Sequence, residues 1–117
     1  REERRLKWLK LLADNRLDAV VYATSDHQPT LIPPDVMTNP NVKDGFGTGS
    51  NRGLSPSLGF PSVTVPAGFT VDNLPVGLEF MARPFAESTL FRLASAYEHG
   101  THNRRPPPKM PALQGEP

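Results

Sequence analysis

Residues 54–81 constrain the fold of this chain most, because they read as two apolar strands joined by a tight turn. In the first half, the apolar residues Val63 and Val65 favour a strand. Pro66 and Gly68 interrupt it, and a proline inside a strand is typical of a sheet edge or of a β-bulge. The first half therefore predicts an irregular edge strand.

The second half follows a turn at Asp72-Asn73. Asparagine tolerates the left-handed backbone conformation that a tight connection needs. After the turn, Val76, Leu78 and Phe80 alternate with other residues, so one face of the second strand is apolar. The two halves together predict an antiparallel hairpin.

A helix is predicted over Glu87–His99, and Gly100 suits its C-terminal cap. Its apolar face carries four residues at helical spacing: Leu90, Leu93, Ala94 and Tyr97. Four aromatic residues are expected to pack in the core between the hairpin and this helix, and we favour that interpretation over a ligand-binding pocket. They are Phe80, Phe85, Phe91 and Tyr97.

The N-terminal part predicts a helix over residues 2–15, followed by a strand within residues 17–24. The helix has leucines at helical spacing and an i,i+4 pair of Glu3 and Lys7. Its basic residues favour a solvated face over a nucleic-acid surface, because no aromatic or glycine-rich surface accompanies them. The apolar run at 17–24 lacks alternation, which is typical of a strand covered on both faces as in a parallel sheet. A helix leading into such a strand indicates an α/β fold.

Composition excludes several classes of protein. The net charge of +1 gives no strong attraction to nucleic acid or to a membrane surface. The chain has no cysteine, so disulfides, thiolate catalysis and cysteine-based zinc sites are ruled out. No apolar run is long enough to span a bilayer. The length of 117 residues suits one domain or part of a larger one, and because the first residue is Arg1 we expect the sequence to be incomplete at its N-terminus.

Residues 25–61 are predicted to be irregular, and a loop of this length either carries function or packs against absent chain. Ser25-Asp26-His27 has the residue types of a hydrolytic triad, but triad members converge from separate segments, so an ordinary polar loop is favoured. His99 and His102 have a metal-ligand spacing, but the predicted helix end at Gly100 separates them and no third ligand is evident.

The run from Gly45 to Gly53 is rich in glycine. A phosphate-binding loop needs a strand before it and a helix after it, and neither is predicted here, so a flexible loop is favoured. Ser50, Asn51 and Arg52 could still offer hydrogen bonds to a ligand.

The chain from Leu17 to Pro107 resembles the closing portion of an amidase signature enzyme. The resemblance rests on the order and spacing of several short motifs: Leu17-Asp-Ala-Val-Val-Tyr-Ala-Thr24, Ser50-Asn-Arg-Gly53, Gly59-Phe-Pro61, Val65-Pro-Ala-Gly68, Leu74-Pro-Val-Gly-Leu78, Arg83-Pro-Phe85 with Glu87, and Ala96-Tyr-Glu98. The family usually has Asp-Gly-Leu-Pro at the turn, and Asp72-Asn73-Leu74-Pro75 preserves the turn chemistry.

The resemblance implies an α/β fold with a large mixed sheet flanked by helices, of which this chain supplies a fragment with an antiparallel hairpin and a C-terminal helix. It also implies amide hydrolysis by two serines and a lysine. The chain has no Gly-Gly-Ser-Ser-Gly-Gly type of stretch, and none of its lysines lies in an apolar strand: Lys7, Lys10, Lys43 and Lys109. No catalytic residue can therefore be assigned to this chain, and the fragment is expected to be poorly stable and inactive alone.

We expect residues 1–105 to form the C-terminal part of an incomplete amidase domain and residues 106–117 to form a proline-rich tail. The expected partners are the missing N-terminal part and, in the complete enzyme, a small-molecule amide whose pocket Asn51 and Arg52 line. No cofactor, metal, nucleic acid or membrane partner is expected, and a cytoplasmic location is the default. Two alternatives stay open: a non-catalytic binding or scaffold module derived from a truncated amidase, and an enzyme supplied in two pieces.

Overall fold

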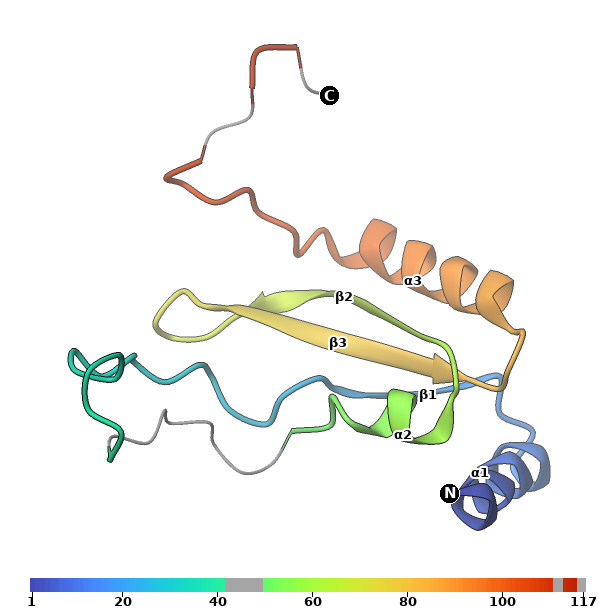
Figure 1. Cartoon of the computed structure of the whole chain (residues 1–117). Helices are drawn as coiled ribbons and strands as arrows, with labels where there is room; N and C mark the ends of the chain where they lie inside the picture. The colour runs from blue at the N-terminus through green and yellow to red at the C-terminus, as the bar shows by residue number, and fades with distance from the viewer. Residues whose placement is uncertain (42–49, 111–112, 116–117) are drawn as a thin grey trace.

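The computed structural model describes residues 1–41, 50–110 and 113–115 (Figure 1). The helices and strands in these residues are α1 (Glu2–Asp14), β1 (Ala19–Ala23), α2 (Leu54–Leu58), β2 (Ser62–Phe69), β3 (Pro75–Ala82) and α3 (Glu87–Thr101). The expected α/β fragment, with a hairpin and a C-terminal helix, is confirmed.

The three strands form a sheet in the order β1-β3-β2, and both pairs are antiparallel. The hairpin prediction is therefore correct, whereas the parallel environment expected for residues 17–24 is not found in the described part of the chain. β1 pairs with β3 in antiparallel register and lies at one edge of the described sheet, where α3 packs mainly on β2 and β3 (Figure 1). Val21 is consequently 51% exposed.

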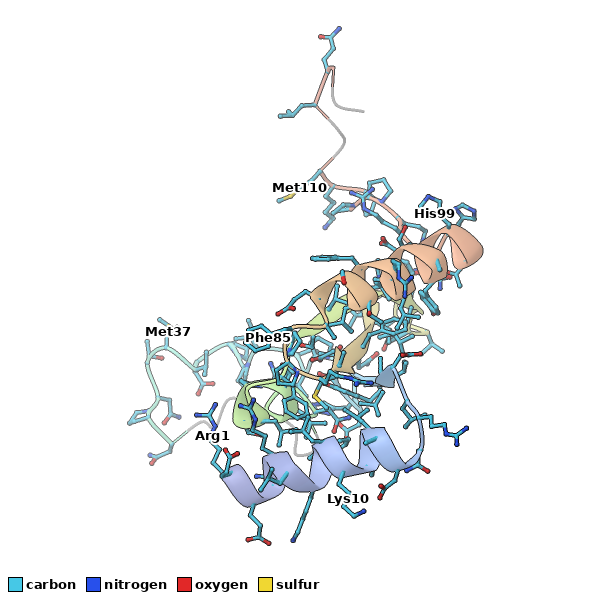
Figure 2. All side chains as sticks on the ribbon, turned by 90° about the vertical axis from the view of Figure 1, so that its right-hand side faces the viewer. Arg1, Lys10, Met37, Phe85, His99 and Met110 are labelled. Carbon is cyan, nitrogen blue, oxygen red and sulfur yellow. The ribbon has the colours of Figure 1, made fainter. Side chains whose placement is uncertain are left out.

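Two apolar clusters lie on opposite faces of the sheet, which makes a three-layer arrangement. One cluster joins the sheet to α3, and its buried members are Val65, Phe80, Ala82, Leu90 and Ala94. The other joins the sheet to α1 and α2, and its buried members are Leu12, Leu58, Phe60 and Met81. Figure 2 shows α1 and α3 on either side of the sheet, with most side chains between them and Lys10 pointing away from the body of the protein.

The irregularity predicted in the first hairpin strand is present. The register of β2 against β3 shifts between Pro66 and Gly68, and Gly68 has a φ of +132°. In the described sheet β2 is an outer strand, where proline removes no ladder hydrogen bond. At the turn, Asn73 adopts a φ of +60°, which agrees with the conformation predicted for it.

The aromatic prediction is half correct. Phe80 and Tyr97 make an edge-to-face contact with their ring centroids 5.9 Å apart. Phe85 is 95% exposed and Phe91 is 66% exposed, so neither belongs to the core of this chain. Phe91 follows the buried Leu90 by one position, and one residue rotates the side chain about 100° around the helix, away from the sheet.

One helix end and one whole helix differ from the sequence prediction. α3 continues through Gly100 to Thr101, and His102 takes the left-handed cap with its amide donating to the Glu98 carbonyl at 3.0 Å. α2 lies within the region expected to be irregular. Its five residues are too few for a periodic pattern, and Pro56 is tolerated because it sits in the first turn.

A polar pair lies inside the sheet between β1 and β3. The Tyr22 hydroxyl donates a hydrogen bond to Glu79 Oε1 at 2.9 Å, and the two residues face each other in register. Glu79 is only 5% exposed. The pKa of Tyr22 lies well above its ordinary value. The largest cause is burial of the hydroxyl, and the hydrogen bond to Glu79 and the charge of its carboxylate raise the pKa further. The protonated hydroxyl therefore serves as the donor that satisfies a buried acid.

We expect alkaline pH to destabilise the chain through Tyr22. Because the folded state holds the Tyr22 proton more tightly than the unfolded chain, this contribution to stability is complete below the unfolded pKa of about 10 and declines as the pH rises above it. Urea unfolding at about pH 8 and about pH 10.5 measures the decline. Tyr22→Phe should lower the free energy of unfolding by about 1–3 kcal/mol at pH 8, because it leaves a buried carboxylate without its donor. An equally steep alkaline decline in Y22F would contradict this account.

Gly77 is required by close packing in the sheet. A Cβ at this position would lie 2.8 Å from Thr64 Cγ2 and 3.2 Å from Thr24 Oγ1. We expect Gly77→Ala to lower the free energy of unfolding by about 1–3 kcal/mol. The matched control is Gly100→Ala, because a Cβ there meets nothing within 4 Å and alanine favours the helix by about 1 kcal/mol. Chemical denaturation of both variants tests the contrast, and equal effects would refute it.

Candidate functional site

An open cleft of about 640 Å³ lies where the hairpin end of the sheet meets the segment that follows β1. Figure 1 shows this segment running alongside the turn between β2 and β3. The lining residues come from both parts of the chain and from residue 52: Thr24, Ser25, Asp26, His27, Gln28, Pro29, Thr30, Ile32, Arg52, Thr64, Thr70, Pro75, Val76 and Gly77.

Two tethers hold the segment after β1 against the hairpin. The Thr24 amide donates to the Gly77 carbonyl at 3.2 Å, which extends the sheet by one position beyond β1. Gln28 Nε2 donates to Asp72 Oδ2 at 2.7 Å, so the turn and the segment are joined at the far end. These bonds span 44 to 53 positions in the sequence, and spacing along the chain gave no signal of them.

Asn51 fastens the returning chain to the end of β1. Its Nδ2 donates to the Ala23 carbonyl at 2.9 Å and its amide donates to the Thr24 carbonyl at 3.2 Å. Ser50 forms an isolated antiparallel bridge with Ser25. Asn51 is therefore held on the outer side of β1, and it is not among the residues that line the cleft.

Arg52 lines the cleft. Its amide and its Nε both donate to the Ser50 hydroxyl, at 3.2 Å and 2.8 Å. These two hydrogen bonds fix the orientation of the Arg52 side chain relative to its own backbone. Of the two residues named from the sequence as pocket residues, the structure places Arg52 at the cleft and Asn51 in the segment that supports it.

The residues of Ser25-Asp26-His27 all line the same cleft. His27 Nδ1 lies 2.5 Å from Asp26 Oδ1, so the two side chains form a local pair. In the part of the chain that the structure describes, no hydrogen bond joins Ser25 to His27. The geometry therefore favours an ordinary polar loop over a hydrolytic triad, in agreement with the sequence prediction.

His99 and His102 line a second, smaller cavity with Glu98, but they do not form a metal site in the described residues. His99 Nδ1 lies 2.7 Å from the Ser95 carbonyl, and His102 caps α3 instead of being separated from the helix at Gly100. No group of three or more histidine, cysteine, aspartate or glutamate side chains suited to a metal ion occurs in residues 1–41, 50–110 and 113–115. The glycine-rich run lies mostly in residues 42–49, outside the described residues, and Gly53 precedes α2.

The described lysines lie away from the sheet and the cleft. Lys7 and Lys10 pair with Glu3 and Asp14 at 2.8 Å and 2.7 Å on the exposed face of α1. Lys109 is exposed, and Lys43 lies outside the described residues. All of the described lysines are exposed, so none of them lies in an apolar strand.

The described helices include none that is long and apolar enough to cross a membrane.

Comparisons with known proteins indicate the family. No protein-family model matches the chain. It is 35% identical over 112 residues to a fatty acid amide hydrolase of Arabidopsis thaliana, an alignment that covers 94% of this chain and 18% of that protein. It is 50% identical over 54 residues to one of the subunits of the glutamyl-tRNA(Gln) amidotransferase of Desulforudis audaxviator, covering 45% of this chain and 11% of that protein.

Solved structures agree with the sequence comparison. The fold matches the peptide amidase PAM in complex with the competitive inhibitor chymostatin, with a TM-score of 0.65 and 34% identity over 88% of this chain and 21% of that one. The native peptide amidase of Stenotrophomonas maltophilia gives a TM-score of 0.59 and 33% identity. The chain spans about a fifth of the length of these enzymes. Because the similarity extends over most of this chain in both sequence and fold, the chain belongs to the amidase signature family and represents a fragment of such an enzyme.

Proposed function

We propose that this chain is the C-terminal portion of an amide hydrolase of the amidase signature type. The observation that carries the proposal is the similarity to a fatty acid amide hydrolase over 94% of this chain, supported by the fold match to peptide amidase. The order of the short motifs, from Leu17 to Glu98, favours the closing portion of the family over any other part.

The packing at the C-terminal end supports the proposed domain limits. The guanidinium carbon of Arg105 lies 3.6 Å from the centroid of the Phe69 ring, so the chain still contacts the sheet at this residue. The described residues beyond it, 106–110 and 113–115, are exposed. We assign residues 1–105 to the amidase domain and residues 106–117 to a proline-rich tail.

The catalytic residues belong to another part of the enzyme in this proposal. The chain has no Gly-Ser-Ser-Gly stretch, and its described lysines are either exposed or paired on the surface of α1. The partner of this fragment is therefore the N-terminal part of the amidase domain, which supplies two serines and a lysine. The cleft contributes one wall of the pocket for a small-molecule amide, with Arg52 at its lining and Asn51 holding the wall in place.

The first test of the proposal is amide hydrolysis. We expect the 117-residue chain alone to release no ammonia from simple carboxamides, because it lacks the Gly-Ser-Ser-Gly stretch and a lysine in an apolar strand. The full-length product of the gene that encodes this sequence should release ammonia from the same amides. Turnover by the 117-residue chain would refute the placement of the catalytic residues. A full-length product without any amidase activity would favour a binding or scaffold module.

The second test concerns Asn51. We expect Asn51→Ala to lower the free energy of unfolding by about 1 kcal/mol, because the side-chain hydrogen bond to Ala23 is lost. We also expect it to raise KM in the full-length product, since the segment that carries Arg52 is no longer fastened. The control is Asn41→Ala, because only the backbone amide of Asn41 makes a described hydrogen bond. Unchanged stability and substrate preference in N51A would contradict the supporting role.

A further inference from the structure

The cleft contains a positive charge that no acid of the described residues neutralises. Arg52 lines the cleft and forms no ion pair in residues 1–41, 50–110 and 113–115. The acid that shares the cleft, Asp26, contacts His27 Nδ1 and forms no ion pair with Arg52 in the described residues. An arginine keeps its charge at all physiological pH values, so the charge persists whatever the protonation of its neighbours.

The guanidinium of Arg52 is oriented by the protein and still has its terminal donors available. Nε donates to the Ser50 hydroxyl at 2.8 Å, whereas Nη1 and Nη2 have no partner in the described part of the chain. The pair of terminal nitrogens forms a flat fork that matches the two oxygens of a carboxylate. The hydrogen bonds of Ser50 and Asn51 fix the backbone from which the Arg52 side chain extends. Less side-chain entropy is therefore lost when the guanidinium binds a carboxylate.

The far wall of the cleft carries no charge. It is formed by residues of the hairpin end: Thr64, Thr70, Pro75, Val76 and Gly77. A ligand that fits has one anionic group for Arg52 and a neutral remainder that lies along these residues. The anionic group of the ligand would then bind Arg52, and a reacting bond would lie in the neutral part of the ligand, away from Arg52.

We infer that Arg52 is a specificity residue that binds the carboxylate of an amide substrate, so that the preferred substrates are amides that carry a carboxylate group. This inference rests on the proposed amide hydrolysis. In that reaction water adds across the carbon–nitrogen bond and the amine leaves, while the carboxylate on Arg52 is unchanged. The ion pair therefore contributes to substrate binding and not to the bond-breaking step.

The test uses two substrates that differ in one group. Succinamate carries an amide and a carboxylate, and succinamide replaces the carboxylate with a second, neutral amide. In the full-length gene product, we expect Arg52→Gln to lower kcat/KM for succinamate by about tenfold or more, mainly through KM, and to leave succinamide nearly unchanged. Arg52→Lys should recover part of the loss, because it keeps the charge without the fork.

The matched control is Arg92→Gln, which removes the same charge from the exposed side of α3, away from the cleft. It should leave both substrates unaffected. Equal losses for both substrates in R52Q, or no loss for either, would overturn the inference while leaving the proposed amidase activity intact.

Calorimetric titration with succinate separates the two proposals if neither amide is hydrolysed. We expect succinate to bind the full-length product about tenfold more weakly after Arg52→Gln and with unchanged affinity after Arg92→Gln. If succinate binding differs in this way but no amide is hydrolysed, the carboxylate site at Arg52 is supported and the proposed amidase function is refuted. Succinate binding that is absent, or equal in R52Q and the unaltered protein, overturns the inference.

Discussion

The central position of β3 is the constraint on which the rest of this structure depends. β3 pairs with β1 on one side and with β2 on the other, and its last four residues are buried. Successive side chains of a strand point to opposite faces, so Phe80 and Ala82 pack toward α3 while Met81 packs toward α1 and α2. A slip of one residue would exchange the two sets and separate Glu79 from the Tyr22 hydroxyl, which the register of both pairs opposes.

The cleft is a consequence of the same pairing. Where β3 begins, its backbone still bonds to Thr24 beyond the end of β1, and Gly77 leaves room for Thr24 and Thr64 to approach closely. The chain then leaves the sheet and is tied back by Gln28 on one side and Asn51 on the other. The position of Arg52 therefore depends on strand pairing and on two side-chain amides. The Gln28 amide bonds to Asp72 in the hairpin turn, and the Asn51 amide bonds to Ala23 at the end of β1.

The two outer strands differ in how their open edges are covered. β2 carries Pro66 and a bulge, which discourage further pairing in the described sheet. β1 has the Asn51 side chain over the Ala23 carbonyl at one end, and Val21 beside it is half-exposed. The side chains of Val21, Phe85 and Phe91 leave apolar surface uncovered in the described part of the chain.

Local sequence determined the elements whose cause is local. The alternation from Val76 to Phe80, the interruption at Pro66 and Gly68, and the turn at Asn73 follow from side-chain period and backbone preference, and the structure contains each of them. The order of the family motifs also led to the amidase signature family. Short elements were harder to predict from the sequence, and α2 has only five residues. His102 takes the cap that Gly100 was expected to provide, because helix ends depend on packing as well as on propensity.

Only the tertiary structure decided which distant groups meet. It separated Phe80 and Tyr97, which touch, from Phe85 and Phe91, which do not, and it set Tyr22 against Glu79. It also held the Asn51 side chain against the Ala23 carbonyl and put Arg52 in the lining of the cleft. The physical reason is that antiparallel pairing joins residues more than fifty positions apart, and neither composition nor spacing along the chain specifies the register that brings them together.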